Sequence, residues 1–160
     1  MRRDSKEREE MNGLPTKILV ATDGSRTAAA AARRAAEMAR AFGAELHVVY
    51  VVPVTQPYHL SLPGPESPSL YEEDMQWARE MLDGQVRKIE ELGSKVAKAH
   101  LRVGEPDAEV IALGEEISAS MIVVGSRGLG RLRRPIGSVS SNVVAHAHCP
   151  VLVVRGEERP

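Results

Sequence analysis

The sequence predicts an α/β fold built on an open five-stranded parallel sheet, with strand order 3-2-1-4-5 and helices on both faces. Short apolar runs alternate with helical segments along the chain, which is the pattern of parallel strands joined by crossover helices. Most of these runs are apolar throughout, as in strands buried on both faces. Right-handed crossovers then favour a doubly wound order, in which the winding reverses between strands 1 and 4.

The composition fits one domain of an ordinary globular protein. The chain has 160 residues, 42% of them hydrophobic, and its net charge of −1 gives no reason to expect nucleic acid or an anionic membrane as a partner. No apolar run approaches the roughly 18–20 residues of a membrane span. The lone Cys149 excludes an intrachain disulfide and fits a reducing, cytoplasmic setting. The polar N-terminus lacks the apolar core of a signal peptide, and we expect residues 1–15 to form a disordered arm.

The first strand and helix are marked by different patterns. Residues 17–21 (KILVA) predict a buried strand, and the turn sequence TDGS follows it. The alanine-rich residues 27–42 predict a helix that Gly43 ends. Residues 45–52 (ELHVVYVV) predict the second buried strand.

A proline-rich stretch, residues 53–68, predicts a long loop before the second helix. That helix is expected over residues 70–92, with Gly93 ending it. Trp77 and a methionine-containing face suggest a binding groove, but helical spacing favours packing in the core. The other apolar positions at this spacing are Met75, Ala78, Leu82, Ile89 and Leu92.

The remaining elements repeat the alternation of strand and helix. They are a strand at 96–103 near a sheet edge, a helix at 106–118 opened by Glu105 and a proline, a strand at 121–124, a helix at 138–147 and a strand at 151–155. We therefore expect one domain over residues 16–156, followed by a short tail at 157–160.

Two loops that are distant in the sequence meet where the winding reverses. The first follows strand 1 at Ala21-Thr22-Asp23-Gly24, and the second follows strand 4 in GSRGLGRLRRPIGSVSSN, residues 125–142. Ligands of such sheets bind outside the carboxyl ends of the strands, and the free amides of a helix N-terminus attract phosphate. Neither a Walker A sequence nor GxGxxG occurs, so the glycines alone fit a phosphate site and a surface turn equally.

Several motifs, in order along the chain, resemble those of the universal stress protein family. They are KILVATDGS at the start, GEP at 104–106, VVGSRGLG after strand 4, and GSVSSNVVAHAHCPVLVV near the end. The resemblance covers residues 17–155 and implies the flavodoxin-like or Rossmann-like α/β fold already expected from the pattern. Its ATP-binding subgroup carries glycine, two residues, glycine, nine residues, and glycine followed by Ser or Thr. Gly125, Gly128 and Gly137-Ser138 occupy these positions here, with eight residues in place of nine before Gly137.

By position, the resemblance assigns twelve residues to an adenine nucleotide, which is ATP or else AMP, ADP or cyclic AMP. Those on the base and ribose side are Ala21, Thr22, Asp23, Val51, Val124 and Gly125, and those at the phosphates are Arg127, Gly128, Gly137, Ser138, Val139 and Ser140. A magnesium ion is compatible with a bound triphosphate. Asp23 alone would also suit a turn or helix N-cap, but its place at the winding reversal favours a ligand role.

Two other polar groups have simpler interpretations. Arg131, Arg133 and Arg134 could attract a nucleotide, but a solvated loop face is favoured, and no aromatic platform for nucleic acid accompanies them. His146 and His148 stand two residues apart and do not share a helix face, so no metal site is expected there.

The last strand, residues 151–155, lies at a sheet edge, where an apolar strand needs cover. The family pairs this strand with its copy in a second subunit, so we expect a homodimer through Val151 to Arg155. The resemblance implies a nucleotide-dependent stress-response regulator in the cytoplasm. No general base stands near the phosphates, so an efficient enzyme is not expected, although slow ATP hydrolysis or autophosphorylation on Ser138 or Ser140 stays open.

Three further functional classes are alternatives to this one. A family member that binds no nucleotide and acts only through protein contacts stays open. A phosphoacceptor receiver domain would need an aspartate at the end of strand 3, which here ends Val103-Gly104. An ATP pyrophosphatase would need a serine- and glycine-rich loop after strand 1, and TDGSRT lacks one.

Overall fold

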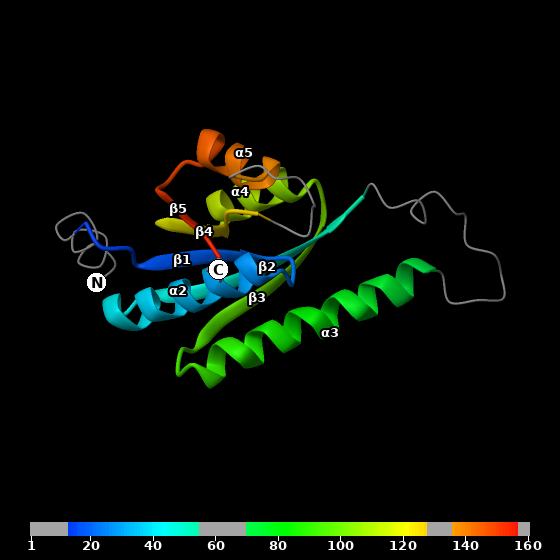
Figure 1. Cartoon of the computed structure of the whole chain (residues 1–160), viewed down its shortest axis with the longest axis horizontal. Helices are drawn as coiled ribbons and strands as arrows, with labels where there is room; N and C mark the ends of the chain where they lie inside the picture. Colours follow the sequence, from blue (N-terminus) through cyan, green and yellow to red (C-terminus); the bar gives the residue numbers. More distant parts are fainter. Residues whose placement is uncertain (1–12, 55–69, 128–135, 157–160) are drawn as a thin grey trace.

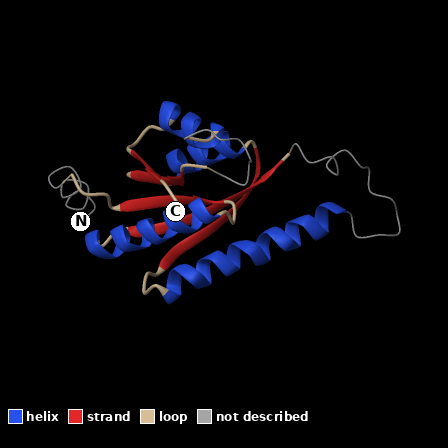
Figure 2. Ribbon diagram, in the orientation of Figure 1, coloured by secondary structure: helices blue, strands red, loops and turns tan. Residues whose placement is uncertain are grey.

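The computed structural model describes residues 13–54, 70–127 and 136–156, and these form a layered α/β structure (Figures 1 and 2). Five parallel strands make one sheet in the order β3-β2-β1-β4-β5, which confirms the predicted fold class and strand order. The elements are β1 (Lys17–Thr22), α2 (Arg26–Phe42), β2 (Glu45–Pro53), α3 (Leu70–Glu91), β3 (Val96–Gly104), α4 (Pro106–Glu116), β4 (Met121–Gly125), α5 (Ser138–His146) and β5 (Val151–Val154).

Several sequence-based expectations fall outside the described residues. They concern most of the N-terminal arm and of the 53–68 loop, the tail at 157–160, and residues 128–135 of the loop between β4 and α5 (the glycine loop, residues 126–137), with Gly128, Arg131, Arg133 and Arg134. Among the helices that the structure describes, none is both long enough and apolar enough to cross a membrane.

The sheet has an apolar cluster on each face. Side chains of α2 and α3 pack on one face, where Ala31, Ala35 and Leu82 meet Ile18 and Val48. Residues of α4 and α5 pack on the other face over a second cluster, which contains Leu19, Val49, Val51, Val110, Leu113, Ile122, Val124 and Val143. The continuous apolar runs of β1, β2 and β4 are therefore explained by burial on both faces.

Both ends of helix α2 are set by capping residues. The Ser25 hydroxyl accepts a hydrogen bond from the amide of Ala28 at 3.2 Å, and Gly43 closes the helix with a left-handed φ of 66°. Its buried face consists of alanines, which lets the helix approach the sheet closely.

Helix α3 follows the expected periodicity with two corrections. Ala78, Leu82 and Ile89 are buried, as predicted. Trp77, which was expected in the core, is 59% exposed, and Leu92 is 46% exposed. The buried stripe of α3 is narrow because the helix covers only one flank of the sheet (Figure 1), so Trp77, next to Ala78 in sequence, lies outside it.

The order of the strands fixes where a ligand site can form. Val20 of β1 is in register with Val48 of β2 on one side and with Val123 of β4 on the other. The chain therefore leaves β1 toward one edge and β4 toward the opposite edge, so the carboxyl ends of these two strands lie side by side beneath diverging loops.

Candidate functional site

The turn after β1 is held by its own polar side chains. One carboxylate oxygen of Asp23 (Oδ1) accepts a hydrogen bond from the Ser25 amide at 2.9 Å, and the Thr22 hydroxyl faces the amide of Gly24 at 3.4 Å. Gly24 has a φ of 79°, which favours glycine. Asp23 thus has the turn role that its residue type alone suggested. Its second oxygen, Oδ2, makes no hydrogen bond to any described residue. This oxygen is therefore available for a ligand at the carboxyl ends of the strands.

The end of β4 presses against the first turn of α2. A Cβ atom on Gly125 would lie 2.8 Å from the carbonyl carbon of Thr27 and 3.0 Å from the amide nitrogen of Ala28. The Thr27 hydroxyl also donates a hydrogen bond to the carbonyl oxygen of Arg127. Gly125 therefore has a packing reason to be glycine, apart from any contact with a nucleotide.

Ser126 holds both ends of the glycine loop. Its amide donates to the carbonyl oxygen of Val154 at 2.8 Å, and its own carbonyl oxygen accepts from the amide of Gly137 at 2.6 Å. The residue is buried. The two described ends of this loop, Arg127 and Ile136, therefore lie close together at the end of the sheet.

The N-terminus of α5 lies at the same carboxyl ends of the strands and has no side-chain cap. Gly137 is its N-cap, with an extended backbone (φ −72°, ψ 165°), and no side chain caps the helix. Ser138 is exposed and Val139 is half-buried. The Ser140 hydroxyl is buried and donates to the carbonyl oxygen of Gly125 at 2.5 Å, so this residue has its amide, rather than its hydroxyl proton, to offer a ligand. Uncapped amides and the helix dipole at such an end favour an anion.

Four predicted site residues share the second apolar cluster. Val51 and Val124 are members of it, and Ala21 and Val139 pack against it. Because these side chains face the α4–α5 layer, they can meet a ligand mainly through their backbone groups. Of the other predicted residues, Arg127 is half-buried beside Thr27, and Gly128 lies outside the described residues.

Sequence reasoning missed Thr27 and Ser126, although these two residues tie the site together. Their sequence signals are weak: Ser126 is a hydroxyl residue that directly follows an apolar strand, and Thr27 is the second residue of α2. Their roles depend on β4 lying beside β1, which only the strand order provides.

Among the described residues, the charged groups elsewhere do not form a metal centre. Within the described ranges, no three His, Cys, Asp or Glu side chains are grouped to hold a metal ion. A nitrogen of His146 lies 3.0 Å from the carbonyl oxygen of Asn142, and one of His148 lies 3.0 Å from that of Ala119. Cys149 packs against the second apolar cluster, and burial raises the pKa of its thiol.

Comparison with known proteins places this chain within a family. The model of the universal stress protein family matches residues 15–155. A universal stress protein of Methanocaldococcus jannaschii is 38% identical over 144 residues, which make up 89% of this chain and 83% of that protein. The solved structure of the universal stress protein from Archaeoglobus fulgidus in complex with dAMP is 30% identical, with a TM-score of 0.66, over 88% of this chain and 98% of that one.

A second solved structure, the universal stress protein UspA from Lactobacillus plantarum, is 27% identical with a TM-score of 0.72 and covers 88% of this chain and 97% of its own. The family match spans nearly the whole described chain, and it agrees with the strand order and with the ordered motifs of the sequence. The chain belongs to the universal stress protein family.

Proposed function

We propose that this protein is a cytoplasmic regulatory module of the stress response that binds an adenine nucleotide and acts as a homodimer. The observation that carries the proposal is the uncapped N-terminus of α5, held at the carboxyl end of β4, the strand that neighbours β1 in the sheet. The hydrogen bonds from Ser140 to Gly125 and from Gly137 to Ser126 fix it there. The Archaeoglobus fulgidus relative, at 30% identity, is described in complex with dAMP, which supports an adenine nucleotide as the ligand.

Different residues would contact the phosphates, the base and the ribose. The amides of Ser138, Val139 and Ser140 would hold the phosphates at the helix N-terminus, and Gly137 keeps that end free of a competing side chain. Arg127 and Gly128 would approach from the other end of the loop. Ala21, Thr22, Asp23, Val51, Val124 and Gly125 would line the base and ribose.

We infer that ATP is the ligand and that magnesium arrives with it. Magnesium keeps several waters and usually binds phosphate oxygens with one or two carboxylates. Asp23 is the one carboxylate among the predicted site residues, and its Oδ2 is unengaged by the described chain. The phosphate oxygens and water would therefore supply most of the magnesium ligands.

Regulation fits this site better than rapid catalysis. None of the described histidines forms a hydrogen bond with a predicted site residue, so a histidine is not placed there as a general base for hydrolysis. If the protein phosphorylates itself, Ser138 is the better acceptor, because it is exposed while the Ser140 hydroxyl donates to Gly125.

Calorimetric titration of the purified protein with ATP, AMP and cyclic AMP tests the proposal. Gly137→Asp should abolish binding, because its carboxylate would cap α5 and occupy the phosphate position. Ala145→Asp, which adds the same charge near the other end of α5, should leave binding intact. Absence of binding at millimolar concentration for all three nucleotides would refute the proposal.

A second function is favoured by one observation. Gly125 and Ser140 already have packing and hydrogen-bonding roles that need no ligand. The protein would then act only through contacts with other proteins. A folded wild-type protein that binds none of the three nucleotides would favour this alternative.

A further inference from the structure

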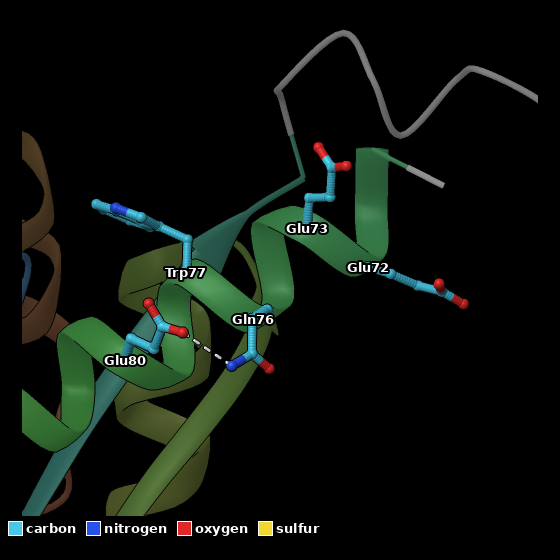
Figure 3. Close-up of a pocket in the computed structure, with 5 residues that line it drawn as sticks. All are labelled: Glu72, Glu73, Gln76, Trp77 and Glu80. Atoms are coloured by element: carbon cyan, nitrogen blue, oxygen red, sulfur yellow. Dashed lines mark hydrogen bonds between the residues drawn. The ribbon is translucent and has the colours of Figure 1, made fainter. Parts of the chain in front are cut away.

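We propose that Trp77, with Glu73 and Glu80, forms a docking surface for a basic peptide segment of a partner protein. The surface lies on α3, outside the candidate nucleotide site, and the proposal does not depend on nucleotide binding. Figure 3 shows these side chains projecting from α3, and all three residues are exposed.

Trp77 is fixed in place but not covered. Its indole ring meets the ring of Tyr50 edge to face, with centroids 6.4 Å apart and planes at 71°. Tyr50 belongs to β2 and packs against the core on the α2–α3 face. This contact holds the indole to the sheet, yet 59% of Trp77 remains exposed.

Carboxylates lie on both sides of the indole along the helix. Glu73 precedes Trp77 by four residues and Glu80 follows it by three, and these spacings bring side chains to one helix face. Together with Glu72 and Gln76, they line an open pocket (Figure 3). The amide nitrogen of Gln76 donates to Glu80 at 2.9 Å and orients that carboxylate. Neither Glu73 nor Glu80 forms an ion pair with a described residue.

The negative charge of this surface favours a positively charged partner. Between Glu72 and Asp83 the helix carries five acidic residues and one basic residue, Arg79. A guanidinium or ammonium group is attracted both to carboxylates and to the face of an indole ring. The surface therefore favours arginine or lysine side chains.

The dimensions favour a peptide over a small cation. Glu80 lies seven positions after Glu73 in the α-helix, which is about 10 Å along the axis. In a polyproline II segment, side chains three residues apart project from the same side at about 9 Å. The residues that line the pocket follow one another along the helix from Glu72 to Glu80, so an extended segment with two such cations can place one at each carboxylate and lie across the indole.

Intrinsic fluorescence gives a direct test, because Trp77 is the only tryptophan in the chain. The probe is an acetylated, amidated Gly-Arg-Pro-Pro-Arg-Gly peptide, which contains no aromatic residue. We expect a saturable change in Trp77 emission with this peptide and none with the analogue that carries glutamine in place of both arginines. The titration is run without nucleotide, so its outcome is separate from that of the proposed nucleotide site.

The double variant Glu73→Gln/Glu80→Gln should weaken binding of the arginine peptide by on the order of tenfold or more, since two charge-assisted contacts are lost. The matched control is Glu90→Gln/Glu91→Gln, which removes two exposed carboxylates from the other end of α3. Circular dichroism confirms that both variants are folded.

Three results would overturn the proposal. One is equal weakening in the control, which would show general charge attraction. Another is an equal response to free arginine at the same concentration, which would indicate a small-cation site. The third is a shift in emission with protein concentration alone, abolished by Glu73→Gln/Glu80→Gln, which would assign the surface to a second copy of the chain.

Discussion

Gly125 and Gly84 show two opposite uses of glycine within one chain. Gly125 has no room for a side chain, because a Cβ would meet the backbone of Thr27 and Ala28 at 2.8 to 3.0 Å. Gly84 lies inside α3, and the nearest atom to its Cβ would be the end of the flexible Arg87 side chain at 3.8 Å. The two positions therefore predict opposite effects of the same substitution.

Gly125→Ala should lower the free energy of unfolding by about 1–3 kcal/mol, because the helix backbone of α2 cannot move aside without disturbing the core. Gly84→Ala should raise it by about 0.5–1 kcal/mol through helix propensity. Urea denaturation followed by circular dichroism measures both. Equal effects of the two substitutions would contradict the packing role of Gly125.

A histidine pair joins β2 to β3 on the α4–α5 side of the sheet. Nδ1 of His47 lies 3.0 Å from Nε2 of His100, with the rings stacked at 5.3 Å. The pKa of His100 is lowered from 6.5 to about 4, chiefly by burial and then by the nearby positive charges of His47, Lys98 and Arg102, while Glu116 opposes them.

Because the pKa of His100 is lower in the folded state, the unfolded chain binds this proton first. Folding stability should therefore fall as the pH drops from about 6.5 toward 4. Unfolding measured at about pH 7 and about pH 5 should show a smaller difference in His100→Gln than in the wild type. His146→Gln, at an exposed position, should retain the wild-type difference, and a loss of the difference in both variants would contradict the assignment to His100.

At the scale of elements, the caps set the boundaries that the sequence predicted. Each element was predicted within about two residues of its observed bounds. The signals were Gly43, Glu105 with its following proline, and the short apolar runs. These signals are local, so the sequence alone carries them. The exposure of Trp77 could not be predicted in this way, because it depends on how far the sheet extends under α3.

The cap of α2 yields a prediction for that helix. Ser25→Ala should reduce the free energy of unfolding by about 1 kcal/mol, since the amide of Ala28 would lose its partner in a buried setting. Ser25→Thr, which keeps the hydroxyl, should lose less. Chemical denaturation of the two variants makes the comparison, and equal losses would mean that the hydroxyl is not what stabilises this end.

At the scale of the whole molecule, β5 forms one edge of the sheet and predicts self-association. The carbonyl oxygens of Pro150 and Val154 accept bonds from Ile122 and Ser126 of the β4 side. Backbone groups alternate along a parallel strand, so those of Val151 and Val153 point away from β4 toward the free edge.

Val153→Pro should therefore remove an outward amide without breaking a hydrogen bond to β4, as proline is tolerated at such edge positions. We expect the wild type to sediment as a dimer and Val153→Pro as a folded monomer in analytical ultracentrifugation. Leu152→Val, which keeps the backbone amide, serves as the control and should remain dimeric. A monomeric wild type at micromolar concentration would refute pairing through this edge.

The candidate site was predictable in outline but not in its connections. The strand order and the motifs brought the turn after β1 and the glycine loop together. The bonds from Thr27 to Arg127 and from Gly137 to Ser126 join residues that are 100 and 11 positions apart. No local pattern encodes these pairs, because they exist only after the sheet has assembled.

Ser126 forms backbone hydrogen bonds with both Val154 and Gly137, so the two ends of the glycine loop are joined to each other and to the sheet. Once Ser126 and Gly137 are bonded to each other, the length of the intervening chain no longer sets the distance between its ends. Adding or removing one residue changes the entropy of closing such a loop only slightly. A loop one residue shorter than the family pattern can thus leave Gly125 and the first turn of α5 where they are, so loop length and site geometry can evolve separately.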